Sequence, residues 1–306
     1  MSPPDPRRPP TGSLPDHRGA GFGYGLLGVV SFSVTLPATR LAVAALDPVF
    51  VGLGRAVVAG IVAAVVLIAT RTRWPGWRYA PGLALVAAGV VIGFPLCTAW
   101  AMQRVPANHG AVVIGLLPLA TAVAAAVLAH ERPTPLFWVT AVAGTAVVVV
   151  FAVYQGGGSV QAADLLLLAA VVAAAVGYAE GGRLAKLIGG WQVICWALVL
   201  SAPVLLIPTA LSIDHRVATA PASAWAGFAY VCGVSMFLGF FAWYRGLAIG
   251  GIAAVGQLQL LQPFLTVFFS ALLLGESVDL ATVVACALVI ATIAVGRAAN
   301  ARRRQA

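Results

Sequence analysis

Ten long apolar runs follow one another from Gly19 to the C-terminal tail, and short clusters of charge separate them. Each run has about the 20 residues that an α-helix needs to cross a bilayer. Backbone N–H and C=O groups cannot stay unpaired in lipid, so we expect these runs to be helices. A membrane β-barrel would alternate apolar and polar positions, and runs such as Val147–Phe151 do not. The predicted spans are 22–44, 48–70, 81–103, 110–129, 135–154, 163–183, 190–211, 224–244, 251–274 and 279–296.

Composition supports a membrane protein over a soluble one. Apolar residues make up 61% of the 306 positions and charged residues 9%, whereas soluble domains average about 25% charged residues. The formal charge of +9 does not indicate nucleic-acid binding, because the basic residues are scattered between apolar runs. The four cysteines lie inside apolar runs without any Cys-x-x-Cys pair, so we expect neither a disulfide nor a metal site.

Basic residues predict how the chain is oriented in the membrane. Residues 1–20 are rich in proline and charge and are predicted to form a disordered cytoplasmic tail, and residues 298–306 form a second, basic tail. With both termini inside, fourteen basic residues are cytoplasmic, and only Arg40, Arg55, Arg104 and Arg216 lie at or near the outer side. This excess places the N- and C-termini in the cytoplasm of a bacterium, with the helices in its inner membrane.

The chain contains an internal repeat, with halves at 21–154 and 162–297. Each half holds five spans, an odd number, so the second copy must cross the membrane in the opposite sense. Inverted repeats place a substrate at their interface near the midplane. The matching positions are Leu116, Pro118, Thr121, Ala126, Leu128 and Glu131, which recur 145 positions later as Leu261, Pro263, Thr266, Ala271, Leu273 and Glu276.

Three short motifs resemble the EamA-type family of the drug/metabolite transporter (DMT) superfamily. They are Gly54-Arg55, the stretch from Leu117-Pro118-Leu119 to His130-Glu131-Arg132-Pro133-Thr134, and the stretch from Gln262-Pro263-Phe264 to Leu274-Gly275-Glu276. The resemblance covers about residues 21–297. It implies an all-α membrane fold of ten helices in two inverted five-helix repeats, a central cavity and export of small metabolites such as amino acids. His130 departs from the family pattern, which usually has glycine before the glutamate.

Glu180 is the most informative side chain in the spans. A carboxylate inside a membrane helix costs about 2.5–3.5 kcal/mol on insertion scales, so such groups are usually functional. With neighbouring Tyr178, Glu180 is predicted to bind substrate or to couple transport to protons. The alternative is an interfacial ion pair with Arg183 at the i+3 position.

A polar face on the ninth span gives the second group of candidates. Gly256, Gln259, Pro263, Thr266 and Ser270 recur at helical spacing, and Gln257 and Gln262 lie to the sides. This face is expected to line a wet cavity or to bond neighbouring helices. Pro118 and Pro263 each free a carbonyl and are predicted to kink their helices.

Several further residues are weaker candidates. Arg55 lies two turns inside its span and is expected to extend outward to the interface or to pair with Asp47. Glu131 and Glu276 end their helices at loops and are expected to be structural or gating residues. The remaining candidates are Phe32, Ser33, Thr35, Thr98, Trp100, Ser235 and Trp243.

The sequence therefore predicts a secondary transporter that exports small metabolites by alternating access, with proton coupling left open. A passive channel is the main alternative. An intramembrane hydrolase built on Ser235 and His109 is disfavoured, because neither Gly-x-Ser-x-Gly nor His-Glu-x-x-His is present. We predict no cofactor, no metal, no nucleic-acid partner and no enzymatic activity. The expected partners are a small-molecule substrate and the lipid bilayer, and the oligomeric state, monomer or homodimer, stays open.

Overall fold

The computed structural model describes residues 17–128, 135–155, 159–250 and 255–305. Every regular element in these ranges is helical, as the apolar runs predicted. The first half contains α1 (His17–Ser33), α2 (Thr35–Val43), α3 (Pro48–Ala69), η1 (Trp77–Tyr79), α4 (Ala80–Val86), η2 (Ala87–Gly93), α5 (Phe94–Met102), α6 (Ala107–Ile114), α7 (Leu117–Leu128) and α8 (Pro135–Gln155).

The second half repeats this order. It contains α9 (Ala162–Ile188), α10 (Gly190–Leu211), α11 (Arg216–Thr219), α12 (Ala222–Tyr230), η3 (Val231–Leu238), α13 (Gly239–Gly250), η4 (Gly256–Leu261), α15 (Gln262–Leu274) and α16 (Leu280–Gln305).

Seven helical stretches are long and apolar enough to cross a membrane. They are Gly19–Val43, Pro48–Ala69, Trp77–Met102, Ala107–Ala124, Ala162–Ile188, Gly190–Leu211 and Ala222–Gly250. Three of the predicted spans correspond to shorter apolar helices, at Trp138–Phe151, Leu258–Leu274 and Leu280–Thr292.

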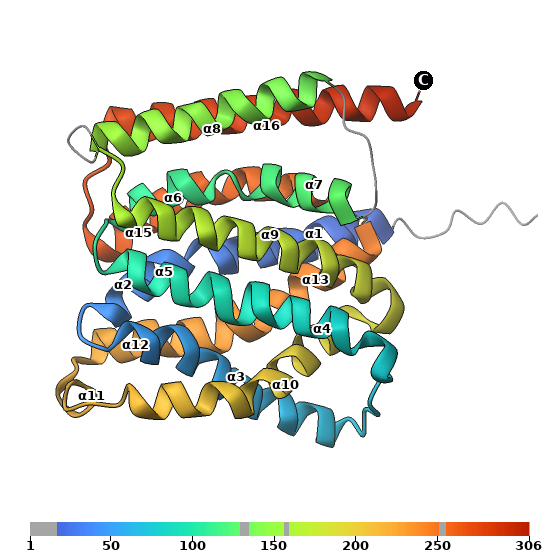
Figure 1. Cartoon of the computed structure of the whole chain (residues 1–306), viewed down its shortest axis with the longest axis vertical. Helices are drawn as coiled ribbons and strands as arrows, with labels where there is room; N and C mark the ends of the chain where they lie inside the picture. Colours follow the sequence, from blue (N-terminus) through green and yellow to red (C-terminus); the bar gives the residue numbers. More distant parts are fainter. Residues whose placement is uncertain (1–16, 129–134, 156–158, 251–254, 306) are drawn as a thin grey trace, which may run out of the picture.

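Several predicted spans are interrupted rather than continuous. The first span breaks at Val34, between α1 and α2, and the fourth breaks at residues 115–116, between α6 and α7. The third and eighth spans each contain a π-helical segment, η2 and η3. The two π-segments lie 144–145 positions apart, which matches the repeat offset seen in the sequence. The helical stretches that contain the two π-segments run in opposite directions. In Figure 1 the chain runs from right to left from α4 to α5, and from left to right from α12 to α13.

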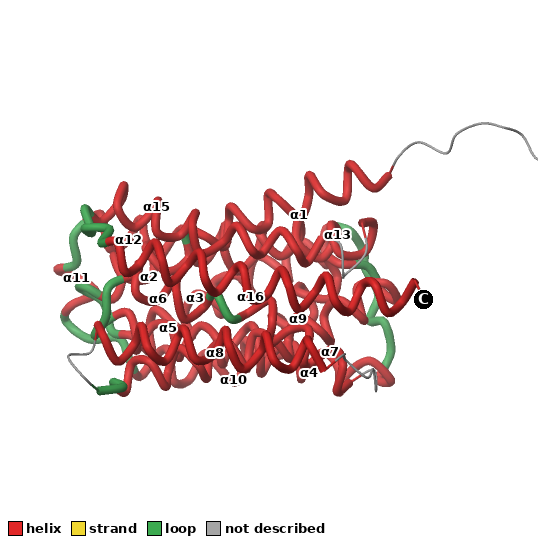
Figure 2. Tube along the Cα trace, turned by 90° about the horizontal axis from the view of Figure 1, so that it is seen from above, coloured by secondary structure: helices red, strands yellow, loops and turns green. Residues whose placement is uncertain are grey.

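The helices pack side by side as one bundle, in which the first and second halves interleave. The pairs α1 with α13 and α3 with α10 join the halves closely. Helices α8 and α16 pack against each other in an outer layer (Figure 1). The start of α1 and the end of α16 lie at the same end of the bundle (Figure 2).

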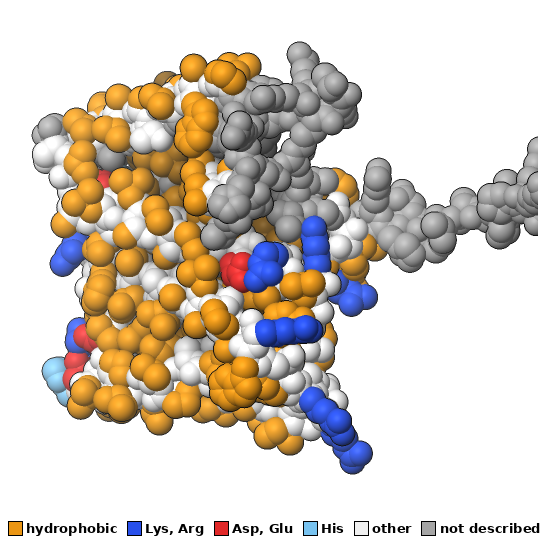
Figure 3. Space-filling view, turned by 45° about the vertical axis from the view of Figure 1, so that its right-hand side comes forward, with side chains coloured by type: hydrophobic (Ala, Val, Ile, Leu, Met, Phe, Trp, Pro, Cys, Tyr) orange, Lys and Arg blue, Asp and Glu red, His pale blue; other side chains and the backbone are white. Residues whose placement is uncertain are grey.

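Apolar side chains cover the middle of the molecule, and the charged side chains visible in Figure 3 lie towards its two ends. Large apolar residues exposed on the surface include Ile61, Val65, Ile68, Val204 and Leu272. Large exposed apolar residues would be costly in water, but lipid tails solvate them. This surface therefore suits a protein embedded in a bilayer.

Glycines bring α9 against the π-segment η2. A Cβ added to Gly89 would lie 3.0 Å from both the backbone nitrogen and the Cα of Gly177. Backbone atoms cannot move aside as a flexible side chain can, so the helix axes would have to separate. The close approach holds η2 against the helix that carries Tyr178 and Glu180.

We expect Gly89→Ala to lower the free energy of unfolding by about 1–3 kcal/mol, the usual cost of overpacking. Gly233→Ala in η3 is the control, because a Cβ there would meet nothing within 4 Å. Tryptophan fluorescence during thermal unfolding of the detergent-solubilised variants measures the difference. Equal unfolding midpoints for the two variants would contradict this account of the packing.

Candidate functional site

A cavity lies where the two halves meet, and five polar side chains line it. They come from five helical segments of both halves, which places the cavity at the interface. The residues are Thr35 of α2, Arg55 of α3, Tyr178 of α9, Ser235 of η3 and Gln262 of α15.

Apolar side chains complete the wall of the cavity, and aromatic rings dominate it. The residues are Phe32, Val90, Phe94, Ala174, Met236 and Phe240. The Phe32 ring stacks on Tyr178 with 6.2 Å between centroids, and it meets Phe240 at 5.0 Å. The cavity volume is about 20 Å³, enough for one water molecule or so.

Among the residues that the structure describes, Arg55 is the one charged residue of this wall. Its side chain is 1% exposed, so it is fully buried, and its Nε and Nη1 atoms have no hydrogen-bond partner among the described residues. The expectation that Arg55 reaches outward or pairs with Asp47 is therefore wrong. Asp47 instead caps α3, accepting hydrogen bonds from the backbone nitrogens of Val49 and Phe50, and it pairs with Arg216.

The two halves make direct polar contact at the cavity. The hydroxyls of Thr35 and Ser235 lie 2.8 Å apart, joining α2 to the π-segment η3. The other π-segment, η2, contributes Val90 to the wall. Single-turn π-helices interrupt the regular hydrogen-bond ladder and are frequent at functional sites. Their presence on both sides of the cavity makes this region a candidate functional site.

Glu180 lies on the same helix as Tyr178 but outside the cavity wall. Its side chain is buried and pairs with Arg183 in a two-pronged arrangement, with Nε to Oε2 at 2.8 Å and Nη2 to Oε1 at 2.6 Å. This is the i, i+3 pair raised as the alternative in the sequence analysis. Arg183 itself is 58% exposed, so the carboxylate lies between the protein interior and solvent.

One end of the bundle, formed by residues 44–47, 103–106, 212–215 and 275–279, carries polar links between the halves; we call it the linked end. Glu276 of the second half accepts hydrogen bonds from the backbone nitrogens of Ala107 and Asn108 at the start of α6, at 2.8 and 2.9 Å. Arg40 of the first half pairs with Glu276 at 3.2 Å and donates to the carbonyls of Met102 and Val105. A carboxylate at a helix N-terminus is stabilised by the unpaired N–H groups there.

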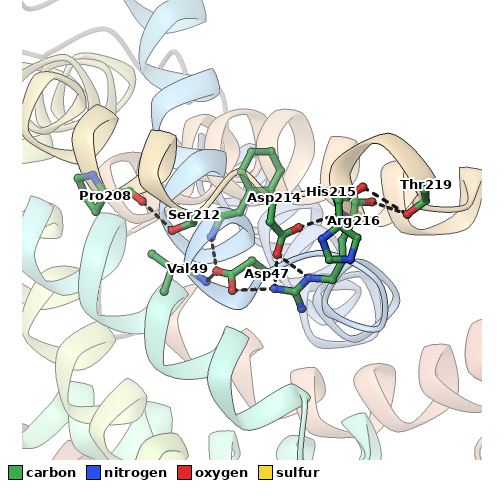
Figure 4. A network of polar contacts seen from close by, with 9 residues as sticks. Asp47, Val49, Pro208, Ser212, Asp214, His215, Arg216 and Thr219 are labelled. Atoms are coloured by element: carbon green, nitrogen blue, oxygen red, sulfur yellow. Dashed lines mark hydrogen bonds and ion pairs between the residues drawn. The ribbon is translucent and has the colours of Figure 1, made fainter.

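Two more links join the halves at this end. Arg216 of the second half pairs with Asp47 at 3.2 Å and also with Asp214 (Figure 4). The hydrogen bond from Arg216 holds the pKa of the Asp214 carboxyl below its usual value. Deeper in the bundle, His109 of the first half and Asp164 of the second are both buried and lie 2.6 Å apart.

The opposite end is different in character. Its charged side chains are mostly basic and exposed, and Glu180 is the acid found there among the described residues; we call it the basic end. Its basic residues are Arg71, Arg73, Arg78, Arg183, Lys186 and Arg245. The linked end is thus held together by ion pairs between halves, whereas the ion pair found at the basic end lies within α9.

The chain matches the model of the EamA-like transporter family twice, over residues 19–153 and 161–296. The chain belongs to the EamA-like transporter family. It is therefore a membrane transporter of the DMT type with two repeats.

Individual proteins agree with this family. The chain is 47% identical to "Uncharacterized transporter YdeK" of Bacillus subtilis (strain 168) over 277 residues, which covers 90% of this chain and 96% of that protein. It is 28% identical to a "Probable terminal-alkyne amino-acid exporter" of Streptantibioticus cattleyicolor over 286 residues, 92% and 95% of the two chains. A crystal structure that is 20% identical shares the fold with a TM-score of 0.66, covering 94% of this chain and all of the other.

The cavity of this EamA-like protein includes five of the candidate residues predicted from the sequence: Phe32, Thr35, Tyr178, Ser235 and Gln262. Others are buried, but their polar atoms bond within their own helices. The Ser33 hydroxyl donates to the Val29 carbonyl, and the Thr98 hydroxyl donates to the Phe94 carbonyl.

The remaining predicted residues lie away from the cavity wall. Gln259 is 2% exposed with an unpartnered Nε2 among the described residues, and Trp100 is half-buried. Pro118 and Pro263 are each the second residue of a helical segment, α7 and α15. The side chain of Gln257, and the whole of Glu131, fall outside the described residues.

Arg55 is the residue of the cavity wall for which the sequence-based expectation was wrong. Its position, two turns inside an apolar span, gave the depth but not the direction of the side chain. The signal was present nevertheless, because an arginine inside a membrane helix is costly and is usually functional.

The structure predicts opposite stability effects for two arginines. Arg55→Met should raise the free energy of unfolding by about 1–4 kcal/mol, since an apolar side chain replaces a buried charge without a protein partner. Arg40→Met should lower it, because it leaves Glu276 without its ion pair. Thermal unfolding in detergent compares the two. A loss of stability in Arg55→Met as large as that in Arg40→Met would show that Arg55 has a structural role.

Proposed function

We propose that this EamA-like protein exports small metabolites, amino acids or related compounds, by alternating access. The observation that supports this most is a polar cavity at the interface of the two halves, with Arg55 buried in its wall. Two inverted five-helix repeats, ten helices in all, would place this cavity near the midplane and let one half rock against the other. The exporter name of the Streptantibioticus relative favours this direction and substrate class.

The basic end suits the cytoplasm, where membrane proteins concentrate arginine and lysine. The N- and C-termini would then be cytoplasmic in a bacterial inner membrane. The linked end would face outward, and its three links between halves would keep the cavity closed on that side. Export requires these links to break and re-form in each cycle.

Proton coupling through Glu180 is part of the same proposal. In the present conformation Arg183 holds the Glu180 side chain in a two-pronged ion pair. If α9 moved during the cycle and separated the pair, the buried Glu180 side chain would be left without its partner. Glu180 would then exchange a proton with the cytoplasm at the basic end.

A passive channel is the second candidate, and the volume of the cavity argues against it. A space of about 20 Å³ suits a carrier that opens to one side at a time. A carrier and a passive channel would lie in the same membrane, so transport against a concentration gradient distinguishes the two.

Cells that overproduce the protein should release amino acids or related metabolites into the medium faster than cells that carry the empty vector. The release should continue when the outside concentration exceeds the inside one. Metabolite profiling of the medium measures it, with cells producing Gly89→Ala, which disturbs packing at η2, as a folding-sensitive control. No solute released above the vector level would refute the export proposal, and release that stops at equal concentrations would indicate a passive channel.

Breaking a link should open the linked end. In a cysteine-free background, Ser235→Cys should react slowly with a membrane-impermeant thiol reagent added on the side of the linked end. Adding Arg216→Met, which removes the partner of Asp47, should raise the labelling rate several-fold. Arg183→Met at the basic end should leave that rate unchanged. An equal increase for both variants would contradict closure by these links.

Glu180→Gln should remove the pH dependence of efflux from proteoliposomes while transport down a gradient persists. Asp214→Asn, which changes an exposed carboxyl in the loop before α11, should leave the pH dependence intact. The measurement is initial efflux at a series of external pH values. Identical pH profiles for Glu180→Gln and the unmodified protein would remove Glu180 from the coupling mechanism.

A further inference from the structure

We infer that the cavity recognises its substrate by a single carboxylate, which binds Arg55, and that an amino group on the substrate is dispensable. This inference rests on the proposed function and specifies the substrate class of the same site. It starts from the charge of Arg55. A guanidinium is protonated at any physiological pH, and a buried charge needs a partner of opposite sign.

The described part of the protein offers no such partner, because its acids are engaged elsewhere. Asp47 and Asp214 pair with Arg216, Asp164 with His109, Glu180 with Arg183 and Glu276 with Arg40. Asp279 accepts a hydrogen bond from the backbone nitrogen of Thr282. An anion that enters the cavity is therefore the group that can neutralise Arg55 there. A carboxylate fits best, since its two oxygens match the parallel N–H groups of a guanidinium.

The rest of the wall defines the other parts of the ligand. The rings of Phe32, Phe94 and Phe240 provide apolar surface for a hydrocarbon body. The hydroxyls of Thr35 and Ser235 and the amide of Gln262 can bond a polar group beside the carboxylate. None of the described residues of the wall is acidic, so an ammonium group meets dipoles and ring faces but no opposite charge.

The repeat explains why one carboxylate and not two would be bound. Helices α3 and α10 each have 22 residues, and the eighth residue is Arg55 in α3 and Ala197 in α10. Ala197 is fully buried. At the repeat offset of 144–145 positions Arg55 corresponds to Val199 or Leu200, so by either alignment the second half has an apolar side chain where the first half has a cation. A dicarboxylate would bring a second negative charge into an apolar site without a partner for it.

The present volume of about 20 Å³ does not admit such a ligand, so binding has to accompany separation of the halves around the cavity. The contact between Thr35 and Ser235 is the polar link that must lengthen. The π-segments η2 and η3 flank the cavity, and a π-bulge can shift its hydrogen-bond register without unfolding a helix.

A ligand series with one apolar body tests the inference on the purified full-length protein. Leucine carries both charged groups, and 4-methylpentanoate carries the carboxylate alone. Leucinamide carries the ammonium beside an amide, and isoamylamine carries the ammonium alone. A parallel series uses phenylalanine, 3-phenylpropanoate, phenylalaninamide and phenethylamine. The apparent Kd of each probe is obtained from dose-dependent thermal shifts in a buffer free of carboxylates. Isosteric dicarboxylates and chloride are measured in the same way.

In at least one of the two series, the amino acid and the carboxylate should both stabilise the protein. The amide and the amine of that series should not. Arg55→Met should raise the apparent Kd of the carboxylate by at least about tenfold. Arg55→Lys should show an intermediate loss, because lysine keeps the charge without the forked geometry. Trp100→Phe, which lies off the cavity wall, is the matched control and should keep the affinity of the unmodified protein.

Three results would overturn the inference: amines or amides that bind as tightly as carboxylates, carboxylate affinity that survives Arg55→Met, or no thermal shift with any carboxylate. A chloride effect equal to that of the carboxylates would reduce the site to non-specific anion binding and would also overturn it. None of these results decides the proposed function, which is judged by solute release from overproducing cells. Release of cationic or neutral solutes alone would leave export standing and the carboxylate site refuted.

Discussion

The burial of the Arg55 guanidinium without a protein counter-ion is the constraint on which the account of this transporter depends. Charges are rare inside membrane proteins because removing them from water costs free energy that a partner must offset. Every described acid of this chain is engaged elsewhere, and Arg55 still lies in the wall of the cavity between the halves. A protein that keeps such a group forgoes stability, which is typical of binding sites.

The polar contacts between the two halves are unevenly distributed along the bundle. Two ion pairs and the buried contact between His109 and Asp164 join the first half to the second at or below the linked end, and Glu276 also caps α6 across that boundary. The ion pair at the basic end lies within one helix. Among the described residues, the halves are therefore joined by more charged contacts at the linked end than at the basic end.

Some of this could be predicted from the sequence, and the physical reasons are clear. Long apolar runs and their spacing indicated membrane helices, because backbone N–H and C=O groups in lipid must be hydrogen-bonded within the protein. The repeat was visible in Pro118 and Pro263, since proline restricts the backbone wherever it occurs. The π-segments were not visible, because their backbone register follows from packing with neighbouring helices. The direction of Arg55 was mispredicted for the same kind of reason, since depth along α3 does not say which neighbours surround the side chain. The ninth-span face gave buried residues, but Gln262, placed beside that face, is the one in the cavity wall.

The most direct test of the central claim is an experimental structure of the full chain in lipid nanodiscs, determined with and without 4-methylpentanoate. The account predicts that the Arg55 guanidinium points into the space between the halves, without a protein carboxylate beside it, and that added density bridges it in the carboxylate-soaked sample. A structure in which Arg55 reaches the lipid interface, or forms an ion pair with an acidic side chain of the protein, would contradict it.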